Sequence, residues 1–248
     1  SAFPEKAGTF TNTNRQVQMA RPAVSMPGDC QQDWWIIQEL ANRIGLDWTY
    51  TGPADVFAEM KITMNSFDNI TWDRLELESV VTYPCDAEDE PGHDIIFGEG
   101  YPTASGRAKI VPAQIVPPDE LPDDEFPFVL TTGRMLEHWH TGAMTRRASN
   151  LNSLQPIPVA SLNPHQLGKL GMGPGDTIKV SSRRGEIEIK VKADRDVPDG
   201  MVFIPFCFQE AAANILTNPQ LDPIGKIPEF KFCAVQVEKL AGTQAAAE

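Results

Sequence analysis

Residues 126–145 read FPFVLTTGRMLEHWHTGAMT, and the interpretation of the chain begins from this stretch. Its first five residues are mostly apolar and predict a strand. Gly133 ends that pattern, and the residues that follow keep neither a helical nor a strand period. Instead they bring together arginine, histidine and threonine side chains. A strand that opens into a loop dense in hydrogen-bond donors is typical of a ligand-binding site.

The donors of this loop indicate what kind of ligand it would hold. Arg134 carries a planar guanidinium that matches phosphate or carboxylate. Further donors come from four other side chains: His138, His140, Thr141 and Thr145. The set suits a large, anionic, heteroaromatic cofactor. Two alternatives remain open, namely a surface loop whose imidazoles are satisfied by water and a pair of histidine metal ligands. No cysteine or carboxylate lies at a matching spacing, so no metal ligand is assigned.

The composition limits the functions open to this chain. Its 248 residues suit one or two domains, and its formal net charge of −13 disfavours nucleic acid as a partner, because phosphates repel an acidic surface. No apolar run reaches the length of a membrane span. The cysteines form no CxxC motif and indicate free thiols in a reducing compartment, which predicts a cytoplasmic protein. Cys207 and Cys233 lie in apolar runs that predict buried packing.

The clearest helix is predicted over residues 33–45, DWWIIQELANRIG. Asp33 can cap its N-terminus, and Gly45 ends it. Five residues at helical spacing form a predicted core face: Trp34, Ile37, Leu40, Ala41 and Ile44. The large rings of Trp35 and Trp48 are also predicted to lie in the core.

Other elements are predicted on either side of this helix. A hairpin is predicted within residues 1–25, where Asn12 and Arg15 are candidates for presentation to a neighbour or cofactor. Two further helices are predicted over residues 54–60 and 71–79.

The second half of the chain predicts short strands separated by tight turns. Residues 117–125, PPDELPDDE, combine three prolines with five acids and indicate a linker. Strands are predicted over residues 108–111, 126–130, 158–161, 177–180, 186–191, 201–206 and 233–237, with a short helix over 164–169. Short strands with glycine turns between them suggest a small closed barrel.

Two later clusters add polar groups beside predicted strand ends. Gln209 and Asn214 follow one strand, and Lys231 precedes the last one. The carboxamide of Asn214 can read the edge of a guanine or pterin ring, and the Lys231 ammonium can meet a phosphate. The alternative interpretations are a helix cap for Asn214 and a solvated lysine.

Several blocks of sequence together resemble a known family. They are GRMLEHWHTGAMTRR (133–147), LNPHQLGKLGMGPGD (162–176), VSSRRGEIEIKV (180–191), DGMVFIPF (199–206) and AANILTNPQLDPIGKIPEFKFCAV (212–235). Their order and spacing are similar to those of the C-terminal cofactor-binding domain of molybdopterin oxidoreductases. The formate dehydrogenase catalytic (alpha) subunit is the nearest match. Residues 3–18 and 33–45 resemble the segment of that subunit just upstream.

The resemblance implies a mixed α/β fold. Residues 105–248 would form a double-psi β-barrel that binds molybdopterin guanine dinucleotide carrying molybdenum or tungsten. Residues 1–104 would be a partial α/β segment of the upstream molybdopterin oxidoreductase domain. The implied cofactor contacts are Arg134, His138, His140, Thr141, Thr145, Asn214 and Lys231, and Gln209 matches a more variable position.

The resemblance also implies a function for the chain. It would be the C-terminal fragment of a subunit that oxidises formate to carbon dioxide, with the rest of that subunit and further formate dehydrogenase subunits as partners. The iron–sulfur cysteines and the metal-ligating residue of the family lie far upstream, so this chain is expected to hold no catalytic residue and to be inactive alone. The alternatives are a fragment of a nitrate reductase-like enzyme and a non-catalytic barrel used as a binding module.

Overall fold

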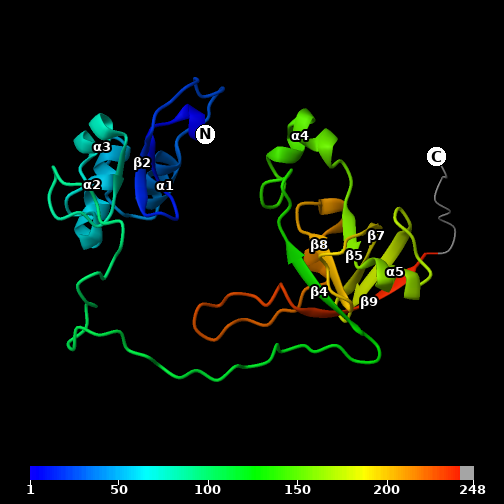
Figure 1. Cartoon of the computed structure of the whole chain (residues 1–248). Coiled ribbons are helices and arrows are strands. Elements are labelled where there is room, and N and C mark those ends of the chain that lie inside the picture. The colour runs from blue at the N-terminus through cyan, green and yellow to red at the C-terminus, as the bar shows by residue number, and fades with distance from the viewer. Residues whose placement is uncertain (241–248) are drawn as a thin grey trace. The chain divides into compact units, whose positions relative to one another are not determined.

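The computed structural model describes residues 1–240 and falls into two compact units, Ser1–Pro112 and Ala113–Glu248, each of which is described by itself (Figure 1). The predicted domains, 1–104 and 105–248, rest on a family resemblance that a division by compactness does not test, so they stay a prediction. No helix in the described part of the chain has both the length and the apolar character needed to cross a bilayer.

The first unit packs three helices with a small antiparallel sheet. The sheet contains β1 (Gly8–Thr11), β2 (Gln16–Ala20) and β3 (Val80–Thr82), in that order, and β1 and β2 form the predicted hairpin. The helices are α1 (Asp33–Arg43), α2 (Pro53–Thr63) and α3 (Trp72–Glu78). Seven buried side chains form its core: Val17, Phe57, Phe67, Ile70, Leu75, Val81 and Cys85.

Local chemistry explains where these elements begin. Pro53 occupies the first turn of α2, where its missing N–H costs nothing. The hydroxyl of Thr71 caps α3 by accepting a 3.1 Å hydrogen bond from the backbone N–H of Arg74. The Arg15 guanidinium donates to the carbonyls of Tyr83, His93 and Asp94 at 2.6–2.9 Å, and its contact with a neighbour or cofactor stays a prediction. Arg15 therefore fixes the loop after β3.

The predicted core face of α1 is wrong. Ile37, Leu40 and Ile44 are 55%, 58% and 80% exposed, and Ala41 is the buried residue of this helix. Trp35 and Trp48, also expected in the core, are exposed. The helical spacing of the apolar residues correctly predicted a helix. An apolar face indicates that a helix is suited to burial on that side, but it does not show which part of a protein covers it.

The predicted strand at residues 108–111 is also wrong. This segment is irregular, and Ile110 and Val111 are both exposed. A strand needs a neighbour to satisfy its backbone N–H and C=O groups, and the described chain pairs none with this segment.

The second unit is a closed six-stranded barrel with strand order β4-β8-β5-β7-β6-β9, which confirms the predicted barrel and the mixed α/β fold. The strands are β4 (Phe128–Gly133), β5 (Val159–Leu162), β6 (Thr177–Ser182), β7 (Gly185–Ala193), β8 (Met201–Pro205) and β9 (Cys233–Lys239). The pairs β4–β8 and β5–β7 are parallel, and the other four are antiparallel. Short helices α4 (Ser149–Leu154) and α5 (Pro164–Lys169) lie in the connections.

Alternating side chains fill the barrel. In β7, Ile187, Ile189 and Val191 point into the core while the residues between them are exposed. The β6–β7 hairpin closes at Ser182 opposite Gly185. A Cβ atom at Gly185 would lie 2.6 Å from Cγ2 of Ile215, so a side chain there would require Ile215 to move. Cys207 and Cys233 are buried, as predicted.

The acidic segment predicted as a linker is tied to the barrel through Glu120. This side chain is only 12% exposed and accepts hydrogen bonds from Arg183 at 2.9 Å, from Arg184 at 2.8 and 2.9 Å, and from the backbone N–H of Ala234 at 3.0 Å. Arg184 also donates to the carbonyl of Leu216. Burial by itself raises the pKa of the Glu120 carboxyl, but the bonds from Arg184, Ala234 and Arg183 outweigh it and hold the pKa below 4.5.

We expect Glu120→Gln to destabilise the barrel by roughly 1–3 kcal/mol, because it leaves two guanidiniums and an amide without their shared anion. Urea unfolding followed by circular dichroism would measure the change in the free energy of unfolding. Asp124→Asn is the matched control, since Asp124 is an exposed carboxylate of the same segment. Equal stability of the two variants would contradict this role.

The stability difference between wild type and Glu120→Gln should depend on pH. Because folding lowers the pKa of Glu120, its contribution is fully present above the unfolded value of about 4.5. It is then lost as the pH falls through the lower, folded pKa. Urea midpoints measured at several pH values should therefore differ by a constant amount near neutral pH and converge in acid. A difference that grows in acid would refute the proposed charge interaction.

Candidate functional site

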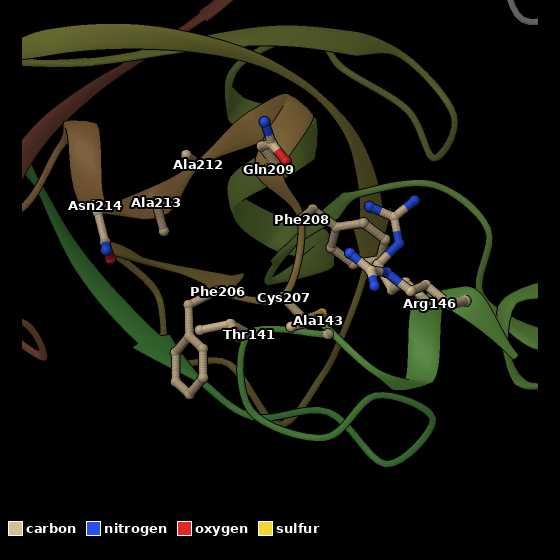
Figure 2. Close-up of a pocket in the computed structure, with 12 residues that line it drawn as sticks. Thr141, Ala143, Arg146, Phe206, Cys207, Phe208, Gln209, Ala212, Ala213 and Asn214 are labelled. Carbon is tan, nitrogen blue, oxygen red and sulfur yellow. The ribbon is translucent and has the colours of Figure 1, made fainter. Parts of the chain in front are cut away.

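A pocket of about 430 Å³ lies at one end of the barrel, between the loop after β4 and the segment after β8 (Figure 2). The parallel pairing of these strands explains why the two segments meet. β4 and β8 run in register from Val129 opposite Met201 to Gly133 opposite Pro205, so their carboxyl ends share one edge. Two stretches supply the residues that line the pocket. The loop after β4 supplies Thr141, Gly142, Ala143, Arg146 and Arg147, and the segment after β8 supplies Phe206, Cys207, Phe208, Gln209, Ala212, Ala213 and Asn214.

Gly142 allows the two walls to approach closely. Its φ is +72°, in the left-handed region that glycine adopts without strain. A Cβ atom there would lie 2.7 Å from the carbonyl oxygen of Cys207 and 2.8 Å from Cγ of Arg146. A side chain at this position would therefore force the walls apart.

Three of the residues predicted to contact a cofactor line the pocket: Thr141, Gln209 and Asn214. Gln209 begins the 3-10 turn η4 (Gln209–Ala211), and Asn214 lies in η5 (Ala213–Ile215). Figure 2 shows the two carboxamides on the wall that follows β8 and Thr141 on the facing loop. Carboxamides and a hydroxyl can both donate and accept, which suits the edge of a heteroaromatic ring.

His138 and Thr145 hold the loop from within. The His138 ring is 2% exposed, and its Nδ1 lies 3.3 Å from Oγ1 of Thr145 while its Nε2 lies 2.9 Å from the carbonyl oxygen of Gln155. The hydroxyl of Thr145 also accepts a 3.0 Å bond from the backbone of Trp139. Both imidazole nitrogens thus have protein partners, and neither His138 nor Thr145 is in the pocket lining. Their contact with a cofactor stays a prediction.

The structure places the other three predicted residues outside the pocket lining. Arg134 is exposed, and its guanidinium has no hydrogen-bond or ion-pair partner within residues 1–240. His140 has a φ of +48° and packs its ring against Trp139. Lys231 donates to the carbonyl of Thr132 at 3.0 Å, which holds its ammonium near the end of β4. Contact of these residues with a ligand also stays a prediction.

Sequence reasoning assigned no role to the adjacent arginines Arg146 and Arg147, both of which line the pocket. Arg146 forms a 2.6 Å ion pair with Glu210, and its guanidinium lies 4.6 Å above the centre of the Phe208 ring (Figure 2). The hydrogen bond from Arg146 lowers the pKa of Glu210 below its ordinary value despite partial burial. The signal that could have revealed the pair was the double arginine directly after the donor-rich loop.

Cys207 lies on the pocket wall as a free, buried thiol. Burial raises the pKa of its thiol to about 11, so it is protonated at neutral pH. Its sulfur lies 3.2 Å from the sulfur of Met135 in a packed contact. The pocket therefore offers cations, carboxamides, a hydroxyl and aromatic rings, which is a set suited to binding an anion linked to a ring.

Comparison with known families matches two separate segments. Residues 128–234 match the family described as "Molydopterin dinucleotide binding domain". This matched segment includes every residue that lines the pocket. Residues 1–43 match the family described as "Molybdopterin oxidoreductase".

Individual proteins are similar over nearly the whole chain. The F420-dependent formate dehydrogenase subunit alpha of Methanocaldococcus jannaschii is 42% identical over 242 residues, which are 97% of this chain and 36% of that protein. The assimilatory nitrate reductase catalytic subunit of Bacillus subtilis is 29% identical over 96% of this chain and 35% of that protein. The chain thus spans about a third of the length of these relatives.

A solved structure shares the fold. Acetylene hydratase from Pelobacter acetylenicus superimposes with a TM-score of 0.71 at 18% identity, covering 96% of this chain and 37% of that one. The two matched family segments and the 42% identity to a formate dehydrogenase subunit along nearly the whole chain show that the chain belongs to the molybdopterin oxidoreductase family and contains its dinucleotide-binding domain.

Proposed function

We propose that this chain is the C-terminal part of a formate dehydrogenase catalytic subunit and that its barrel binds molybdopterin guanine dinucleotide. The observation that carries the proposal is the pocket between the segments that follow β4 and β8, where cationic, carboxamide and hydroxyl side chains meet within residues 128–234. The 42% identity to a formate dehydrogenase subunit along nearly the whole chain favours formate as the substrate of the complete protein.

The residues of the pocket fit a dinucleotide. Guanidinium groups match phosphate oxygens, and the carboxamides of Gln209 and Asn214 can pair with the polar edge of guanine or pterin. Arg134, His140 and Lys231 would extend this surface beyond the pocket lining. His138 and Thr145 would act by holding the loop, unless ligand binding replaces their internal bonds.

The chain's share of the reaction would be to bind and orient the cofactor. When bound, a molybdenum or tungsten pterin supplies the redox chemistry that oxidises formate to carbon dioxide. The side chains described above would fix its phosphates and rings and exclude water from them. The metal ligand, the iron–sulfur clusters and the remaining subunits would come from other parts of the enzyme, and residues 1–248 alone would be inactive.

A second candidate is a catalytic subunit that reduces nitrate. The similarity to the Bacillus subtilis nitrate reductase covers nearly the whole chain but reaches only 29% identity, against 42% for the formate dehydrogenase subunit. The barrel chemistry suits both enzymes, because both substrates would react at the cofactor. Formate is therefore the better supported substrate.

In the complete subunit, Arg134→Ala and Lys231→Ala should each weaken cofactor binding by roughly tenfold to a hundredfold, since a charge-assisted hydrogen bond contributes about 1.5–3 kcal/mol. The measurement is the metal and guanine nucleotide retained after extended dialysis, which does not depend on turnover. Arg195→Ala and Lys192→Ala are the matched controls, because both residues are exposed on the barrel and outside the pocket.

Melting temperatures would separate a binding defect from unfolding, which matters because Lys231 also bonds to the backbone of β4. If both variants retain a full complement of metal and nucleotide, the assignment of Arg134 and Lys231 to the cofactor site is wrong.

A further inference from the structure

We propose that the two adjacent arginines of the pocket have different tasks: Arg146 is a positioning residue that braces the walls through Glu210, and Arg147 supplies the cation that meets the ligand's phosphate. The inference rests on the proposed function and assigns the two arginines different roles within that site. It follows from what each guanidinium already contacts.

Each nitrogen of the Arg146 guanidinium already donates a hydrogen bond to the protein. It forms the 2.6 Å ion pair with Glu210, donates at 3.3 Å to both Asn152 and the carbonyl of Pro156, and stacks over the buried Phe208 ring. Its charge is already neutralised by a carboxylate, so an incoming phosphate would have to compete with Glu210 for the same donors.

These contacts join two segments that are far apart in the sequence. Asn152 and Pro156 belong to the stretch around α4, whereas Phe208 and Glu210 follow β8. The His138 ring packs perpendicular to the same Phe208 ring with centroids 5.6 Å apart, which adds a second link between the loop after β4 and the segment after β8. Because Glu210 follows Gln209 directly, the ion pair also fixes the turn that carries this carboxamide.

Arg147 differs from its neighbour in every one of these respects. It lines the same pocket and is exposed, yet its guanidinium forms no hydrogen bond, ion pair or ring contact with any residue from 1 to 240. Both arginines lie in the 3-10 turn η3 (Thr145–Arg147), where successive side chains point about 120° apart. One can therefore be held inward while the next faces a ligand with its charge uncompensated.

A rival arrangement uses the same residues. In it, the ligand displaces Glu210, and Arg146 then binds the phosphate. Glu210→Gln separates the two possibilities, because it keeps the Arg146 cation and removes its anionic partner. If Arg146 positions the walls through Glu210, this variant loosens the walls and the pocket binds its ligand less tightly. If Arg146 instead binds the phosphate, the variant frees its guanidinium and the pocket binds anions more tightly.

The experiment uses the complete subunit prepared without cofactor, with GDP as the charged probe and guanosine as its uncharged counterpart. Arg147→Ala should raise the Kd for GDP about tenfold and leave that for guanosine unchanged, as expected for one lost charge-assisted contact. Glu210→Gln and Arg146→Ala should weaken both probes alike and speed amide exchange in residues 206–216, which Arg147→Ala should not do. Arg195→Ala is the charge-matched control.

Tighter GDP binding by Glu210→Gln, or unchanged GDP binding by Arg147→Ala, would overturn the assignment. A wild-type subunit that binds no GDP would overturn the proposed function together with the role of Arg147. Amide exchange in Arg146→Ala and Glu210→Gln would still test the positioning role of the Arg146–Glu210 pair, because this measurement needs no ligand. Unchanged exchange in residues 206–216 would refute that role.

Discussion

The parallel pairing of β4 with β8 is the constraint on which the candidate site depends. Parallel neighbours cannot be joined by a tight hairpin, and in this barrel the chain forms β5, β6 and β7 between β4 and β8. Because β4 and β8 run in the same direction, the segments that follow them both begin at the same end of the barrel. Since the register ends with Gly133 opposite Pro205, both loops start at the same level.

Several arginines of the described residues bind the chain's own carbonyl groups and carboxylates. Arg15 and Arg74 satisfy carbonyl groups in the first unit, and Arg183 and Arg184 share Glu120 in the second. Arg146 is paired in the same way. An arginine in a donor-rich motif is therefore weak evidence for ligand contact until its existing partners are known.

How much the sequence predicts depends on how local the determining interaction is. The cap of α5 follows from Asn163, whose side chain accepts a 3.0 Å bond from the backbone of His165, and the β6–β7 hairpin follows from alternation around a short turn. The core face of α1 and the strand at residues 108–111 failed because each needs a distant partner. In the site, residue type indicated Thr141 and Asn214, but it could not show that His138 turns inward or that Arg147 stands free.

The distribution of thiols in this chain has a practical consequence for labelling. Cys85, Cys207 and Cys233 are buried, and desolvation raises the pKa of each, so little thiolate forms and access is restricted. Cys30 is exposed. A maleimide dye applied under native conditions would accordingly attach at Cys30 first, which provides a single fluorescent reporter without any engineered cysteine.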